Sequence, residues 1–175
     1  NIVIVVTSFV LSMWISNTSA TAILSAVTIG ILACLDPQIP DAKTRERVAV
    51  RLLLSCAFAA SIGGLATPVG SPPNLIALKL LAAQGITLNF VEWLMIALPI
   101  SLVMLLLMLG IFEFCFPLRA LTFPGIKEKF QSLAKELGPM KAGEVQIACI
   151  FAVTVALWVL PGVLKSALPD NSLVN

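Results

Sequence analysis

The chain has 175 residues, of which 59% are hydrophobic and 11% are charged, and its formal net charge is +2. Soluble domains carry roughly a quarter of their residues as charged side chains, so this composition indicates an integral membrane protein. The small net charge argues against nucleic-acid binding, and four cysteines without a C-x-x-C pair, in a chain without histidine, argue against a metal site or a disulfide framework.

Residues 2–35 are apolar except for a polar knot at residues 16–19, Ser-Asn-Thr-Ser. A membrane span needs about 20 residues, so this run is too long for one span and too short for two. As helices, the arms 2–15 and 20–35 would each reach roughly 21–24 Å, short of a hydrocarbon core of about 30 Å. These lengths favour a re-entrant helical hairpin, residues 1–35, with Asn17 at its tip near the membrane midplane. The alternative is one long tilted helix whose Ser and Thr side chains bond back to its own carbonyls.

A loop and an interrupted span follow the hairpin. Residues 36–51 are a proline-broken loop that leads into a basic helix start, with Lys43, Arg45, Arg47 and Arg51. Residues 52–84 are predicted to form one span that is broken by a Gly/Pro stretch at 63–76 and is helical again from 75. Proline removes a backbone donor and clashes with the preceding turn, and glycine loosens the chain further. Unwound backbone at membrane depth is tolerated only where it is buried in protein or lines a wet cavity. The Gly/Pro stretch is therefore predicted to offer carbonyl groups to a ligand.

The remaining chain contains two further predicted spans. Residues 91–116 form an apolar span, kinked at Pro99, and residues 144–161 form a second one, followed by a short end at 162–175. Between them, 117–143 is the most polar segment, with apolar residues at helical spacing: Ile126, Phe130, Leu133 and Leu137. This pattern predicts an amphipathic helix in the membrane interface, and a partly disordered loop is the alternative.

Charge predicts the orientation. Most Lys and Arg residues lie in the loops 36–51 and 117–143, whereas the connection 84–91 has none. By the positive-inside rule the two basic loops are cytoplasmic and the connection is external, in a multi-pass protein of the cell (inner) membrane.

The polar knot and the Gly/Pro stretch share one chemical property. Neither contains a Lys or an Arg, yet interrupted helices offer N-termini that suit a carboxylate and carbonyl ends that suit Na⁺. The Gly/Pro stretch lacks the spacing and the lysine of a nucleotide-phosphate loop. Without histidine, and with carboxylates only near helix ends or in loops, the chain has no catalytic constellation and is not predicted to be an enzyme.

Two motifs carry a resemblance to a known family. Residues 13–22, Met-Trp-Ile-Ser-Asn-Thr-Ser-Ala-Thr-Ala, precede residues 61–76, Ser-Ile-Gly-Gly-Leu-Ala-Thr-Pro-Val-Gly-Ser-Pro-Pro-Asn-Leu-Ile. In this order and spacing they resemble the N-terminal repeat of the divalent-anion:sodium symporter family, which includes bacterial di- and tricarboxylate transporters. The resemblance covers essentially the whole chain. It implies an all-α integral membrane fold, one inverted repeat with a re-entrant hairpin and a broken transmembrane helix.

The resemblance also implies a sodium site. Its ligands would be the carbonyls of Ser12 and Ser16, the side chain of Asn17 and the carbonyl of Gly70.

For the substrate, the resemblance implies that Asn17, Thr18 and Ser71 face a carboxylate. Thr67 and Asn74 are added as possible supporting residues from their position in the stretch. The alternative is that Thr67, Ser71 and Asn74 only satisfy carbonyls that the broken helix leaves free.

The expected function is Na⁺-coupled symport of a small dicarboxylate, such as succinate, malate or fumarate, by elevator-type alternating access. Na⁺ would be the coupling ion, with no other cofactor, and the full-length protein would be a homodimer. No second Ser-Asn-Thr or Pro-Pro-Asn motif follows residue 76, so we expect a fragment of a longer protein. The alternatives are a Na⁺-independent exchanger of citrate or tartrate against succinate, an arsenite or proton-coupled relative from the wider superfamily, and a non-transporting membrane module.

Overall fold

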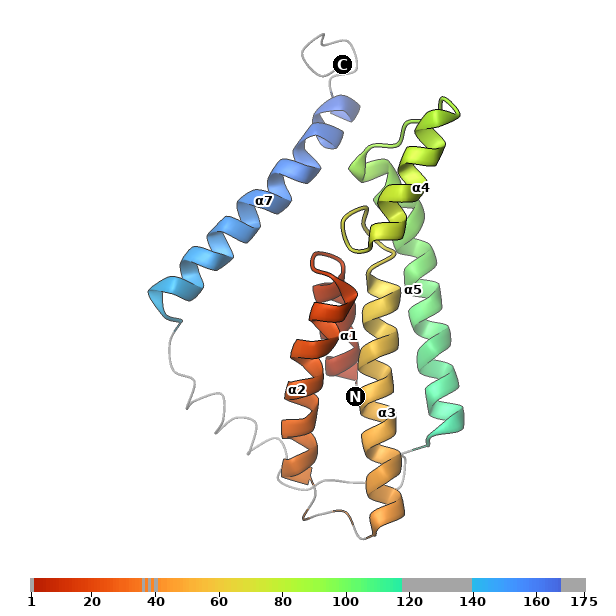
Figure 1. Ribbon diagram of the computed structural model, residues 1–175, viewed down its shortest axis with the longest axis vertical. Coiled ribbons are helices and arrows are strands. Elements are labelled where there is room, and N and C mark those ends of the chain that lie inside the picture. Colours follow the sequence, from red (N-terminus) through yellow and green to blue (C-terminus); the bar gives the residue numbers. More distant parts are fainter. Residues whose placement is uncertain (1, 36, 38, 40, 118–139, 168–175) are drawn as a thin grey trace. The chain divides into compact units, whose positions relative to one another are not determined.

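The computed structural model describes residues 2–35, 37, 39, 41–117 and 140–167 (Figure 1). In these residues the chain forms six helices and no strand: α1 Ile2–Ser12, α2 Asn17–Leu35, α3 Ala42–Gly63, α4 Pro72–Ala83, α5 Phe90–Cys115 and α7 Ala142–Ala167. The described part is all-helical, as the sequence predicts. By length and composition, α2, α5 and residues 142–164 of α7 are each sufficient to cross a membrane.

The chain divides into two compact units, one of Asn1–Leu88 with Trp93–Phe123 and the other of Asn89–Glu92 with Pro124–Asn175. The first unit holds α1 to α4 and most of α5. The second holds α7, and within it Phe90 stacks on Trp158 with the ring centroids 6.4 Å apart. All the groups of the predicted site belong to the first unit.

Helices α1 and α2 form a helical hairpin that packs against α3 (Figure 1). Residues 13–16 are the hairpin tip, and α2 begins at Asn17 because the Ser16 hydroxyl accepts a hydrogen bond from the Ser19 amide at 3.2 Å. The polar knot therefore enters the first turn of α2 instead of forming a separate tip. The arms are unequal, 11 and 19 residues, or roughly 16 and 28 Å at the rise of a helix. The prediction of two short arms is therefore wrong for α2, which is long and apolar enough to cross a membrane.

The broken span consists of α3, a break at residues 64–71, and α4. Helix α3 begins at Ala42, ten residues before the predicted start of the span at 52, so residues 42–51 of the predicted loop 36–51 are helical. The helix begins this early because Asp41 caps it, by accepting a hydrogen bond of 2.8 Å from the Thr44 amide. Helix α4 begins at Pro72, three positions before the predicted restart at 75. Proline is tolerated in the first turn, where a backbone N–H would have no helical partner, so the prolines end the break.

A buried cluster joins the hairpin, the broken span and α5. It is formed by Val5, Phe9, Ala59, Ile62, Ala66, Leu105, Met108 and Phe112. The cluster extends to Ala66, inside the break. The unwound segment is thus anchored to the same core as the helices around it.

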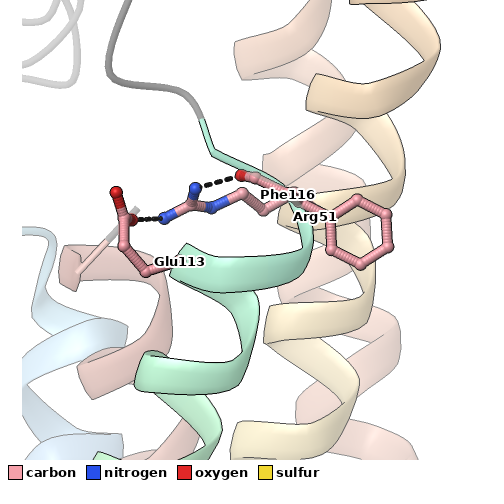
Figure 2. A network of polar contacts seen from close by, with 3 residues as sticks. All are labelled: Arg51, Glu113 and Phe116. Atoms are coloured by element: carbon pink, nitrogen blue, oxygen red, sulfur yellow. Dashed lines mark hydrogen bonds and ion pairs between the residues drawn. The ribbon is translucent and has the colours of Figure 1, made fainter.

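An ion pair fixes the last turn of α5 to α3, as Figure 2 shows. Arg51 is 6% exposed, and its Nη2 donates to Oε2 of Glu113 at 2.5 Å. Its Nη1 donates to the carbonyl of Phe116. From the sequence, Arg51 was interpreted as a topology signal only, because the pairing of residues 62 positions apart leaves no local pattern.

The later elements differ from the prediction at one boundary. Helix α5 covers almost the predicted span, with Pro99 inside it. Helix α7 continues to Ala167 through Pro161, where the sequence predicts an end. Apolar membrane helices tolerate proline, since neighbouring groups satisfy the carbonyl that it frees. The predicted amphipathic helix of 117–143 lies mostly outside the described residues.

Candidate functional site

The hairpin tip and the break lie in contact. The Thr67 hydroxyl donates a hydrogen bond to the Met13 carbonyl, 54 positions away. The end of α3 also approaches α1 closely, because a Cβ atom on Gly63 would lie 2.2 Å from the carbonyl oxygen of Phe9. No other residue type fits there without displacing backbone. The two motifs singled out in the sequence therefore form one structural feature.

Asn17 is held against the break by two contacts. Its Oδ1 accepts a hydrogen bond of 2.6 Å from the Ser12 hydroxyl. A Cβ atom on Gly64 would lie only 2.0 Å from the same Oδ1. The glycine thus leaves room for the Asn17 amide to lie directly on the backbone where α3 ends.

The Gly70 backbone faces two carbonyl oxygens. A Cβ atom on Gly70 would lie 2.9 Å from the Ser12 oxygen and 2.8 Å from the Gly64 oxygen. The amides of residues 14 and 15 both bond to the Leu11 carbonyl. Within the residues that the structure describes, no hydrogen bond reaches the Ser12 carbonyl.

The Gly70 carbonyl is likewise left without a donor in the described chain. Pro72 and Pro73 have no backbone N–H, and the Asn74 amide bonds to the Ser71 carbonyl at 3.1 Å. The proline pair therefore frees this oxygen. Two unpaired carbonyls and the Asn17 amide oxygen belong to the same contact region.

Ser16 and Thr18 lie at the start of α2. The Ser16 carbonyl accepts the first helical hydrogen bond, from Ala20 at 2.9 Å, so one of its two lone pairs is already used. Thr18 is exposed and borders an open hollow of about 440 Å³, lined by Asn17, Thr18, Thr21, Ala22, Ala57 and Ser61. A hollow therefore adjoins the N-terminus of α2.

Ser71 is the N-cap of α4 and is buried at 9% exposure, yet its side chain makes no capping hydrogen bond. The second helical residue is a proline, and the amide of the third, Asn74, bonds to the Ser71 carbonyl, so both amides that a capping hydroxyl usually serves are unavailable. The Ser71 hydroxyl is thus not used by its own helix.

Thr67 and Asn74 hold the shape of the break. Both are buried, at 0% and 4% exposure. The Nδ2 of Asn74 donates to the Gly64 carbonyl at 2.7 Å and to the Thr67 carbonyl at 2.8 Å. The Thr67 hydroxyl also accepts from the Gly70 amide at 3.1 Å. The Asn74 contacts are those of the alternative, in which the side chain satisfies carbonyls that the broken helix frees, whereas the Thr67 hydroxyl donates to the Met13 carbonyl of the hairpin tip.

The site contains no ionisable side chain. Residues 13–22 and 61–76 hold none, and the described residues contain no cluster of acidic, cysteine or histidine side chains suited to a divalent metal. The buried Arg51 lies about 18 Å from Gly63 along α3, by helical rise. At this site the described residues therefore offer a charged ligand carbonyl, hydroxyl and amide groups and the partial positive charge of helix N-termini.

Two contributors were not anticipated from the sequence. The Ser12 hydroxyl, which orients Asn17, was missed because only the Ser12 carbonyl was considered. Trp93 was missed altogether; its indole Nε1 donates to the Leu65 carbonyl, in the break, at 3.2 Å. Nothing in the pattern around Trp93 distinguishes it from an ordinary interfacial tryptophan.

A family model described as sodium:sulfate symporter transmembrane region matches residues 1–174. Three relatives illustrate its range. An uncharacterized transporter of Haemophilus influenzae is 38% identical over 158 residues, which are 90% of this chain and 30% of the relative. A sodium-dependent dicarboxylate transporter of Staphylococcus saprophyticus is 32% identical over 155 residues, 85% of this chain and 30% of the relative.

The third, a low-affinity phosphate transporter of Saccharomyces cerevisiae, is 29% identical over 160 residues, 91% of this chain and 16% of the relative. The chain thus spans less than a third of the length of these curated relatives.

Proposed function

Because the chain belongs to the sodium:sulfate symporter family, we propose that it supplies one half of the ligand site of a secondary-active transporter that couples Na⁺ to a small dicarboxylate. The membership agrees with the resemblance to the divalent-anion:sodium symporters. The family is one of transporters and not of enzymes. The observation that carries the proposal is the meeting of free carbonyls with the Asn17 amide oxygen between hairpin and break.

The proposed Na⁺ site uses oxygen ligands. Hard cations prefer carbonyl, amide and water oxygens. The carbonyls of Ser12 and Gly70 receive no hydrogen bond from the described residues, and Oδ1 of Asn17 is fixed by the Ser12 hydroxyl. The second lone pair of the Ser16 carbonyl would complete the set.

The proposed anion site uses helix N-termini. Helix α2 begins at Asn17, and the free N–H groups with partial positive charge at its N-terminus favour a carboxylate. Helix α4 begins with Pro72 and Pro73, which have no N–H, so it would add its dipole but no amide donor from these two residues. Thr18 beside the hollow and the unused hydroxyl of Ser71 would add hydrogen bonds. A bound Na⁺ next to these groups would favour the anion further, which couples the two ligands.

The membrane arrangement is part of the proposal. The hairpin would enter the membrane from the cytoplasmic side without crossing it. The segment 36–51, which includes the first turns of α3, and the segment 117–143 would be cytoplasmic, in a protein of the inner membrane. The complete protein would be a homodimer that moves its site across the membrane by elevator-type alternating access.

Transport by the complete gene product in proteoliposomes tests the function. We expect succinate uptake that requires an inward Na⁺ gradient and that Asn17→Ala reduces to the level of protein-free liposomes. Ser25→Ala, about two turns further along α2, should retain wild-type uptake. Uptake by Asn17→Ala with unchanged Na⁺ dependence would refute the role of Asn17.

The same assay distinguishes the proposed symport from the alternative transport functions. Uptake without Na⁺ that needs an internal counter-anion would identify an exchanger. Sulfate and phosphate should be tested as competitors, since the family description and the yeast relative's name include these anions.

A further inference from the structure

The carbonyls of the break have partners from two different sources. Asn74 serves those of Gly64 and Thr67, and it belongs to α4 of the same broken span. The Leu65 carbonyl is served by Trp93, which belongs to the first turns of α5. Trp93 is therefore a donor to the break from outside the broken span.

The indole is suited to this contact. Its single N–H donates and has no competing acceptor function, while the ring is apolar. The ring lines a hollow of about 390 Å³ with wholly apolar walls, together with Leu65, Leu81 and Ile96. Without the indole N–H, the Leu65 carbonyl would face this apolar surface with no partner, which is costly at membrane depth.

The Leu65 peptide adjoins the atoms proposed to bind Na⁺. Leu65 follows Gly64, on which Oδ1 of Asn17 lies and whose carbonyl faces the Gly70 backbone. Next along the chain, Ala66 is fully buried in the core cluster. Because the core cluster holds Ala66 in place, the orientation of the Leu65 carbonyl determines the backbone conformation between Gly64 and Ala66.

We infer that Trp93 is a positioning residue for the cation site. Its indole N–H fixes the orientation of the Leu65 carbonyl, and this in turn fixes the position of the Gly64 backbone on which the Asn17 side chain lies. This inference rests on the proposed Na⁺ site. Trp93 touches neither ligand and acts through the backbone of the break.

The test uses the complete gene product in proteoliposomes, with Na⁺ titrated at saturating succinate. Trp93→Phe retains an aromatic ring and removes the donor. It should raise the Na⁺ concentration for half-maximal uptake by roughly three- to tenfold, the effect of one lost hydrogen bond, while the maximal rate stays near that of the wild type. Trp93→His at pH 8 has a smaller ring that carries an N–H and should restore part of the Na⁺ affinity.

Trp158→Phe is the matched control, because Trp158 lies in the second unit and stacks on Phe90. It should leave Na⁺ affinity unchanged. Equal Na⁺ affinity in wild type, Trp93→Phe and Trp158→Phe would overturn the inference. So would a loss in Trp93→Phe that Trp93→His does not reduce.

Na⁺-dependent thermal stabilisation of the purified variants in detergent provides a second readout if Trp93→Phe transports too slowly to titrate. The midpoint of that stabilisation should shift by the same factor, and an unshifted midpoint would contradict the inference. If the wild type shows neither Na⁺-dependent uptake nor Na⁺-dependent stabilisation, the proposed function itself fails, which is distinct from failure of the role of Trp93.

Discussion

The Ser12 hydroxyl donates a hydrogen bond of 2.6 Å to Oδ1 of Asn17. Ser12 is the last residue of α1 and Asn17 is the first of α2, so this bond closes the hairpin tip. With the hydroxyl as the donor, the amide oxygen is the end directed at Ser12, because the amide nitrogen cannot accept a hydrogen bond. The Ser12 side chain orients the group whose oxygen is proposed to bind Na⁺, while the Ser12 carbonyl is itself a proposed ligand.

Ser12→Ala should weaken Na⁺ binding without abolishing transport. The variant keeps the carbonyl and loses the orienting bond, so we expect the half-maximal Na⁺ concentration for uptake to rise roughly three- to tenfold. Ser101→Ala is the control, because its hydroxyl is also buried and bonds at 2.8 Å only within its own helix, to Ala97. An unchanged Na⁺ titration in Ser12→Ala would show that Asn17 is oriented by other contacts.

Substitution by alanine should have different effects at the neighbouring positions Gly63 and Gly64. At Gly63 a Cβ atom would meet the Phe9 backbone at 2.2 Å, and backbone cannot move aside cheaply. Gly63→Ala should therefore lower the free energy of unfolding, by about 1–3 kcal/mol. At Gly64 the Cβ atom would meet the Asn17 side chain at 2.0 Å, which can rotate away. Gly64→Ala should thus impair Na⁺ binding far more than it lowers thermal stability.

Gly30→Ala is the control for both glycine variants, since a Cβ atom there has nothing within 4 Å. It should be neutral or slightly stabilising, because alanine is the better helix former. Thermal unfolding in detergent, with and without Na⁺, measures both quantities. Equal losses of stability in Gly63→Ala and Gly64→Ala would contradict the distinction.

The sequence predicts the helical class and the main interruptions because these depend on local chemistry. Apolar runs of known length indicate spans, and prolines that lack an N–H indicate where a helix is interrupted. The polar knot and the Gly/Pro stretch could be expected to meet only through the family resemblance. Local pattern alone does not place residues 54 positions apart, such as Met13 and Thr67, in contact.

The contacts that sequence reasoning missed are long-range side-chain bonds. Trp93 to Leu65 and Arg51 to Glu113 join separate elements, and each residue has an ordinary local explanation. Two of the boundaries that differ, at Pro72 and Pro161, have one cause. Proline was interpreted as ending helices, whereas it also begins them and is tolerated inside apolar ones.

Asn74 should be important for stability as well as for transport. Asn74→Ala removes the donor of the Gly64 carbonyl and leaves the Thr67 carbonyl with only the longer bond of 3.4 Å from the Gly70 amide. An unsatisfied buried carbonyl costs about 1–3 kcal/mol, so a clear drop in unfolding temperature is expected. Asn74→Asp should be worse, because a carboxylate would face two carbonyl oxygens. Gln84→Ala, exposed at the end of the same helix, should unfold like the wild type. Similar behaviour of Asn74→Ala would argue against a structural role of the Asn74 side chain in the break.

The cap of α3 should weaken in acid. Hydrogen bonds from the Thr44 amide and hydroxyl, first among several causes, hold the pKa of Asp41 below its ordinary value. A carboxyl with a lowered folded-state pKa contributes stability above its unfolded pKa, and this is lost as pH falls through the folded value. Protection of the Thr44 amide from hydrogen exchange should therefore decrease below about pH 4. In Asp41→Asn, which does not titrate, protection should not change with pH in this range.

The ion pair of Arg51 and Glu113 should behave as a coupled unit. Arg51 has an 8% exposed side chain and Glu113 a 37% exposed one, so the pair lies between the exposed and the buried extremes. Exposed pairs contribute about 0.2–1 kcal/mol, whereas breaking a buried pair costs about 3–5 kcal/mol. We expect intermediate losses of unfolding free energy for Arg51→Met and for Glu113→Leu.

The double variant Arg51→Met/Glu113→Leu decides whether the losses come from the pair. Removing Glu113 alone leaves a buried guanidinium that still bonds to the Phe116 carbonyl, and removing both charges eliminates that penalty. The double variant should therefore be more stable than the sum of the single losses predicts, by about 1 kcal/mol or more. The control cycle pairs Arg47→Met, exposed one turn earlier on α3, with Glu113→Leu and should be additive. Additive losses in the Arg51 cycle would mean that the pair fixes neither helix, and that the core cluster alone holds α5 against α3.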